Sequence, residues 1–85
     1  MNSQIKTPWK KVIRVRPMEN FSLELVWEDN HHSRIELDEL IRTKNVLWRL
    51  RYPQYFKQVT VDVLGGICWP EGEDLSPDFL SHYSR

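Results

Sequence analysis

Residues 21–40 read FSLELVWEDNHHSRIELDEL, and this stretch decides the fold. Large apolar side chains occupy every second position of its first part: Phe21, Leu23, Leu25 and Trp27. Polar residues fill the positions between them, apart from Val26. A period of two sends alternate side chains to opposite faces of a strand, so we expect a β-strand with one face on the core and one in solvent.

The residues after this strand predict a hairpin. Residues 29–32 are suited to a turn, since Asp29 and Asn30 tolerate left-handed backbone geometry. Residues 34–37 then alternate again between polar and apolar side chains, which predicts the partner strand.

The spacing then changes from that of a strand to that of a helix. Leu37, Leu40 and Ile41 lie at helical intervals, and Asp38 and Glu39 favour a helix N-terminus.

The rest of the chain adds shorter elements. Residues 11–16 predict a first strand that Pro17 closes, because proline cannot donate to a ladder. In the C-terminal half, residues 46–51 are ambiguous between strand and helix. The further elements are a short helix over 52–56 with Pro53 at its first position, strands over 59–63 and 67–69 joined by Gly65-Gly66, and a last helix that starts at Ser76-Pro77-Asp78.

Together these elements predict a single α+β domain over residues 11–85, in the order β-β-β-short helices-β-β-α. Because the links within each hairpin are short, the sheet of about five strands is expected to be mostly antiparallel, with helices on one side. Its open edges leave unpaired backbone groups, where a second copy or a partner strand could bind. Residues 1–10 are expected to be a flexible lead-in.

Composition narrows the class of protein. The chain has 85 residues, a formal net charge of zero and one cysteine, Cys68, so no internal disulfide can form. A small domain without disulfides suits a reducing compartment. No run approaches the roughly 18 apolar residues of a membrane span. We therefore expect a cytoplasmic protein without a membrane partner.

An acidic stretch near the C-terminus is the first candidate site. It carries four carboxylates, Glu71, Glu73, Asp74 and Asp78. Such a group could bind Mg²⁺ or Ca²⁺ and serve a metal-dependent hydrolase. The stretch lacks the ligand pattern of an EF-hand loop, and Asp78 already belongs to a helix start. We favour a structural role and expect no metal.

Histidines and the cysteine give no catalytic arrangement. His31 and His32 are neighbours that point different ways in an extended turn, and His82 lies far along the chain. Cys68 precedes Trp69 in a predicted strand and is more plausibly a small buried side chain than a nucleophile. We expect no catalytic residue and no cofactor.

A basic and aromatic segment is the second candidate site. It contains Arg42, Lys44, Trp48, Arg49, Arg51, Tyr52, Tyr55 and Lys57. Arginines beside aromatic rings are typical of surfaces that bind single-stranded nucleic acid, and we take Arg49, Arg51, Tyr52 and Tyr55 as the candidate interaction surface. The alternative, which we favour, is that Trp48, Leu50, Tyr52 and Phe56 fill the core, because a net charge of zero lacks the usual basic excess.

The C-terminal motif tryptophan-proline-x-glycine-x-aspartate-leucine resembles that of the small bacterial domains called domain of unknown function family 2442. The residues that carry the motif are Trp69, Pro70, Gly72, Asp74, Leu75 and, after it, Pro77. The family pattern is also similar at Val12, at residues 15–17, 21–27, 35–37, 50–51 and 59–62, and at Leu40 and Phe56. The family commonly has a glycine where this chain has Asp29-Asn30, and we expect Asn30 to supply the same backbone geometry.

The resemblance implies an α+β fold and no established activity. Some relatives carry a helix-turn-helix domain after this one, and others are encoded beside a second small protein, as an antitoxin would be. We therefore expect a non-enzymatic interaction or regulatory domain. Its partner would be another protein, such as one encoded nearby, or a second copy in a homodimer. Nucleic-acid binding through residues 49–55 is the alternative, and a metal-dependent hydrolase is a weaker one.

Overall fold

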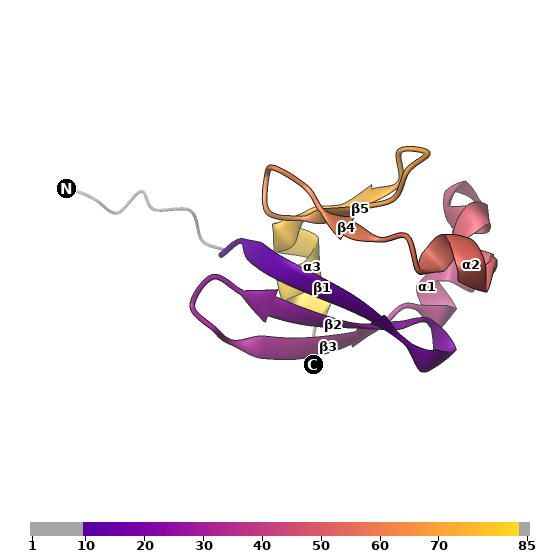
Figure 1. Cartoon of the computed structure of the whole chain (residues 1–85). Coiled ribbons are helices and arrows are strands. Elements are labelled where there is room, and N and C mark those ends of the chain that lie inside the picture. The colour runs from indigo at the N-terminus through magenta and orange to yellow at the C-terminus, as the bar shows by residue number, and fades with distance from the viewer. Residues whose placement is uncertain (1–9, 84–85) are drawn as a thin grey trace.

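Figure 1 shows the computed structural model, which describes residues 10–83. Most of the predicted lead-in therefore lies outside the described residues. The elements in chain order are β1 (Val12–Met18), the 3₁₀ helix η2 (Glu19–Phe21), β2 (Ser22–Trp27), β3 (His32–Glu36), α1 (Asp38–Thr43), the 3₁₀ helix η3 (Asn45–Arg51), α2 (Pro53–Phe56), β4 (Thr60–Val61), β5 (Ile67–Cys68), β6 (Asp74–Leu75) and α3 (Pro77–Tyr83).

The first sheet is built as the alternating pattern predicts. β1, β2 and β3 pair antiparallel in that order, with β2 in the centre. Leu23, Leu25 and Ile35 on its inner face are fully buried. Trp27 is buried beside them, and its indole N–H donates to Ser33 Oγ at 2.8 Å. Burial of each large apolar side chain contributes about 1.5–3 kcal/mol, so this face supplies much of the stability of a small domain.

The hairpin between β2 and β3 turns at Asn30. Its φ is 69°, which confirms the expected left-handed geometry without a glycine. Asp29 fixes the turn, since its Oδ1 accepts the His31 backbone N–H at 3.0 Å. Asparagine and aspartate are among the few residues that stabilise such a turn locally.

Two details of the first hairpin differ from prediction. The expectation that Pro17 closes the first strand is wrong, because β1 continues to Met18 and Pro17 pairs with Leu23. β1 is an outer strand of its sheet, where a residue without a backbone N–H is tolerated. Phe21 lies in η2 with a φ of 58° rather than in the second strand. Its ring packs edge-on against Phe56 at 5.2 Å.

The helical segments follow the sequence closely. α1 starts at Asp38, as the acidic first turn predicts. The ambiguous residues 46–51 lie in η3, which buries Leu47 and Leu50. α2 has Pro53 at its start, where the missing N–H costs nothing. In Figure 1, α1 and α2 lie together at one end of the molecule, away from α3.

The second half forms a separate small sheet. β4, β5 and β6 pair antiparallel in that order. β4 is shorter than predicted, because Asp62 Oδ1 accepts the backbone N–H groups of Leu64 at 2.8 Å and Gly66 at 3.1 Å and so turns the chain. Mixed α+β architecture with antiparallel pairing is confirmed. A single sheet of about five strands with helices on one side is only an approximation, since the six strands of residues 10–83 form two sheets of three.

The two sheets meet at β1 and β4. The Val12 backbone N–H donates to the Gly65 carbonyl oxygen at 2.9 Å, and the two strands lie side by side in Figure 1. A side chain at Gly66 would collide with the Leu75 carbonyl oxygen, so the glycine permits close approach of β5 and β6. The shared core consists of Val12, Leu23, Leu25, Trp27, Ile35, Leu37, Ile41, Leu47, Leu50, Phe56, Val59, Ile67, Trp69 and Leu80.

The start of α3 gives a first prediction. Ser76 Oγ accepts the Phe79 backbone N–H at 3.1 Å, which satisfies one of the open donors of the first turn. We expect Ser76→Ala to lower the free energy of unfolding by about 1 kcal/mol, the usual loss of an N-cap. Urea denaturation measures it. Ser81→Ala, at an exposed position inside α3, should leave stability unchanged or raise it slightly. Equal losses in the two variants would contradict the capping role.

Candidate functional site

Glu71 and Glu73 of the acidic C-terminal stretch lie in the hairpin between β5 and β6. The Trp69 backbone N–H donates to the Glu73 carbonyl oxygen at 2.9 Å, and the Gly72 N–H donates to the Trp69 carbonyl oxygen at 3.1 Å. Gly72 has a φ of 113°, a conformation that side chains disfavour. Pro70 and Glu71 are exposed at the tip. The motif therefore closes a tight hairpin.

Glu73 does not face solvent with the other acids. Its side chain is only 4% exposed and has its hydrogen-bond partners in η3 and α2. Arg49 Nη1 donates to Glu73 Oε2 at 3.0 Å, and the Tyr55 hydroxyl donates to Oε1 at 2.5 Å. The same hydroxyl accepts the Glu71 backbone N–H at 2.7 Å. We call Arg49, Tyr55 and Glu73 the carboxylate clamp.

The clamp keeps its carboxylate ionised. Burial alone would raise the pKa of Glu73, but the hydrogen bonds from Tyr55, from its own backbone N–H and from Arg49 outweigh burial and lower the pKa below its ordinary value. The pKa of Tyr55 is raised, first by desolvation and then by its hydrogen bond to Glu73. The clamp therefore holds a phenol and a carboxylate in their donor and acceptor forms over a wide range of pH.

Trp69 fixes the same hairpin from the core side. It is 3% exposed, and its ring lies 6.1 Å from that of Phe56. Its indole N–H donates to the Phe56 carbonyl oxygen at 2.9 Å. The tail motif thus binds the end of α2 through both Trp69 and Glu73.

The other motif residues lie around this hairpin. Asp74 and Leu75 form β6, and Asp74 pairs with Cys68. Pro77 is buried at the first position of α3. These contacts are within the domain, so they explain the motif by structure.

The predicted interaction surface separates into two parts. Arg49 and Tyr55 belong to the carboxylate clamp, whereas Arg51 and Tyr52 are exposed. Arg51 Nη2 donates to the Arg42 carbonyl oxygen at 3.4 Å, so its side chain lies back along α1. The structure does not bring all four side chains to one free surface.

The favoured interpretation, that four side chains of this segment fill the core, is right for only two of them. Leu50 and Phe56 are buried, but Trp48 is 47% exposed and Tyr52 is 60% exposed. Their rings pack edge to face at 6.3 Å. Arg49 lies over the Trp48 ring at 4.9 Å from its centroid. Val46, on the same short helix, is 74% exposed.

We call Val46, Trp48 and Tyr52 the aromatic surface. Two of its members come from the predicted basic and aromatic segment, and Val46 is an addition. Its exposure has no simple sequence signal, because η3 is a 3₁₀ helix with a kink at Leu47 and follows no single period.

The four carboxylates of the acidic stretch do not converge. Glu73 is in the clamp, Asp74 is in β6, and Asp78 lies 3.5 Å from His82 Nδ1 in α3. His31 and His32 are in the β2–β3 hairpin. Cys68 Sγ lies 3.5 Å from Thr60 Oγ1. Within residues 10–83, no three His, Cys, Asp or Glu side chains come together to hold a metal ion.

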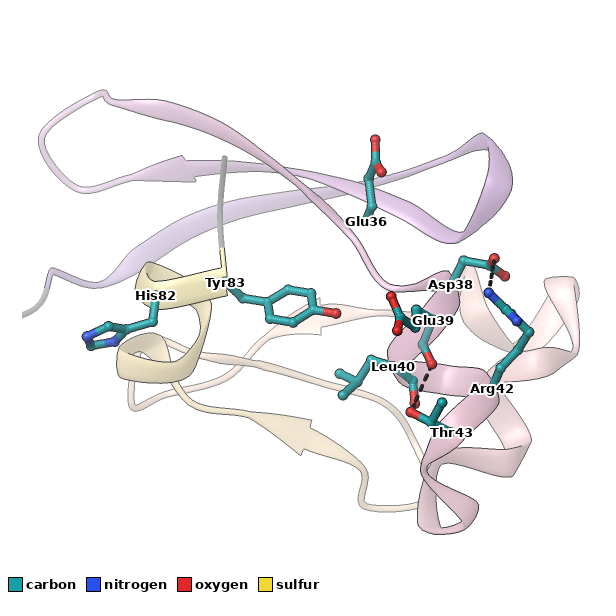
Figure 2. Close-up of a pocket in the computed structure, with 8 residues that line it drawn as sticks. All are labelled: Glu36, Asp38, Glu39, Leu40, Arg42, Thr43, His82 and Tyr83. Atoms are coloured by element: carbon teal, nitrogen blue, oxygen red, sulfur yellow. Dashed lines mark hydrogen bonds and ion pairs between the residues drawn. The ribbon is translucent and has the colours of Figure 1, made fainter.

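A hollow lies between α1, the end of β3 and α3 (Figure 2). Tyr83 extends from α3 toward Glu39 and Leu40, while His82 points away. Asp38 pairs with Arg42 one turn along α1 at 3.3 Å. The lining side chains are exposed or half-buried, and their ion pair belongs to one helix surface, so the hollow has no preorganised charge for a ligand.

The comparisons with known proteins give one result. No curated protein and no solved structure was found that matches the chain. None of the helices in residues 10–83 has the length and apolar character to traverse a lipid bilayer. A family model described as "Protein of unknown function (DUF2442)" matches residues 12–85, and the chain therefore belongs to the DUF2442 family.

Proposed function

We propose that the chain is a non-enzymatic protein-interaction domain that binds its partner through the aromatic surface. The observation that carries the proposal is the contact between Trp48 and Tyr52, which pack on each other at 6.3 Å while both remain about half exposed. Tryptophan, tyrosine and arginine dominate the binding energy of protein interfaces.

The aromatic surface is held in place before any partner binds. Arg49 lies over the Trp48 ring, and its guanidinium is anchored by the buried Glu73 carboxylate. The ring therefore rests on a cation that cannot move freely. A side chain fixed in this way loses little conformational entropy on binding, which raises affinity for a given contact area.

The charges around the surface indicate the chemistry of the partner. Arg51, which precedes Tyr52 in the chain, is exposed, and Arg49 lies over the Trp48 ring. An apolar pocket with carboxylates on its rim would complement this arrangement. An antitoxin-like role fits the same proposal, with a small protein as the occupant.

Single-stranded nucleic acid is a weaker candidate for the same surface. Stacking on Trp48 and Tyr52 is chemically reasonable. Arg49, however, is already paired with Glu73, and the chain has a net charge of zero. Phosphate binding needs free cations, so we favour a protein partner.

Affinity capture tests the proposal. Tagged chain and a Trp48→Ala/Tyr52→Ala variant are used to recover partners from the native cell, followed by titration of the recovered protein. We expect the double variant to lose at least about tenfold in affinity, because two interface rings are removed. A Val63→Ala/Leu64→Ala variant is the matched control, since these side chains are 92% and 75% exposed on another loop.

The outcomes separate the candidates. Loss of the partner in the first variant and retention in the second would support the aromatic surface. Equal capture by both variants would show that it is not the contact. A salt-dependent shift of labelled single strands, lost in the first variant, would replace the protein partner with nucleic acid.

A further inference from the structure

β3 is the outer strand of the first sheet. Its inner side pairs with β2, and in residues 10–83 no strand pairs with its outer side (Figure 1). At the two ends of the pairing, Trp27 N–H donates to the His31 carbonyl oxygen at 2.8 Å and Leu37 N–H donates to that of Phe21 at 2.9 Å. The odd-numbered residues of β3 therefore direct their backbone N–H and C=O groups to β2.

The alternation of an antiparallel ladder sends the remaining backbone groups the other way. His32, Arg34 and Glu36 thus direct their N–H and C=O groups to the open side of β3. An exposed edge of this kind is a template for another strand.

Two side chains of opposite charge lie on this edge strand. Arg34 and Glu36 are exposed on the solvent face, whereas Ile35 between them is fully buried. In the described part of the chain neither side chain forms an ion pair. Arg34 makes only a long 3.5 Å contact with Ser22 Oγ.

The nearest cross-strand acid is already engaged. Glu24 pairs with Arg34 in the strand register, but its carboxylate accepts Arg16 Nε at 3.0 Å from the other side. The acid opposite Arg34 is thus already paired with a second arginine, and Glu36 has no basic neighbour opposite it, since it pairs with Ser22.

We propose that β3 binds β3 of a second copy of this chain, antiparallel about a two-fold axis at Ile35. This register makes the outward backbone groups of Arg34 and Glu36 meet those of the opposite strand. It places each Arg34 beside the Glu36 of the other copy and so forms two salt-bridged pairs from one sequence.

Charge selects this register over its neighbours. A shift by two residues in one direction would place Arg34 beside Arg34 of the second copy, and in the other direction it would place Glu36 beside Glu36. Like charges directly opposite each other destabilise a sheet. The continuous sheet would have six strands across the dimer, because each copy contributes three.

Sedimentation equilibrium of the full chain over a range of concentrations tests this pairing. We expect a monomer–dimer equilibrium that Arg34→Glu and Glu36→Arg each weaken at least about tenfold, because each places two like-charged pairs at the axis. We expect the double variant R34E/E36R, in which the two charges are exchanged, to dimerise as the wild type does. An equimolar mixture of the two single variants should form a heterodimer.

Matched controls separate edge pairing from general charge effects. Lys57→Glu has the same charge change as Arg34→Glu at an exposed site on another segment, and should leave the equilibrium unchanged. Arg34→Pro removes an outward N–H and should abolish dimers while the far-ultraviolet circular dichroism stays native. A wild-type chain that stays monomeric, or a dimer that both single charge variants leave intact, would overturn the proposal.

Discussion

Trp69→Ala is expected to lower the free energy of unfolding by about 3–5 kcal/mol, which is a large share of the 5–15 kcal/mol of a typical domain. The substitution leaves a cavity between Phe56 and the hairpin, because the indole is 3% exposed and packs on that ring. It also leaves the Phe56 carbonyl without its indole donor. Urea denaturation followed by circular dichroism measures the loss.

Two further variants divide this loss into its parts. Trp69→Phe retains a ring but removes the N–H and part of the buried volume, and the unpaired carbonyl should account for about 1–3 kcal/mol of its loss. Trp48→Ala is the matched control on the surface and should cost less than about 1 kcal/mol. Similar losses at positions 48 and 69 would contradict the burial of Trp69.

Glu73→Ala should have the second largest effect, a loss of about 2–4 kcal/mol at neutral pH. It removes the carboxylate that binds Arg49 and the Tyr55 hydroxyl. We expect a smaller loss of stability than for a fully buried ion pair, because the Arg49 side chain is 38% exposed and can turn to water once Glu73 is removed. Glu71→Ala, at the exposed hairpin tip, serves as the control, since the bond to Tyr55 uses the Glu71 backbone.

The effect of Glu73 must depend on pH with a definite sign. The pKa of Glu73 is lowered in the folded state from an ordinary value of 4.5. The carboxylate thus stabilises the fold above that value, and the contribution is lost as pH falls through the lowered pKa. Wild type and Glu73→Gln should differ most near neutral pH and converge in acid. A difference in unfolding free energy that is constant from neutral pH to about pH 3 would falsify the ionised clamp.

The first half of the fold is readable from the sequence because its strands are long enough to show a period. Leu23, Leu25 and Trp27 set the inner face without help from distant residues. The second half is harder, because β4, β5 and β6 have two residues each and no period can be counted over that length. Their pairing depends on turns at Asp62 and Gly72.

In the candidate site, too, the sequence pattern alone does not predict where a single side chain lies. Trp69, Glu73 and Leu75 have the same parity in the β5–β6 hairpin, and that parity would have placed Glu73 on the inward side with Trp69. The charge of Glu73 predicts the opposite, a solvent-exposed side chain, since buried carboxylates are rare unless they are paired. The partners Arg49 and Tyr55 lie far away in the sequence, so only the folded chain shows that they satisfy it.

The hydrogen bond between Val12 and Gly65 affects how the molecule can come apart. It joins the edge of the first sheet to the β4–β5 hairpin, and the carboxylate clamp joins the next hairpin to the central helices. Neither three-stranded sheet can separate without exposing the core residues of the other, such as Leu25 and Ile67. We therefore expect the two sheets to unfold as one cooperative unit, with a single melting transition for both.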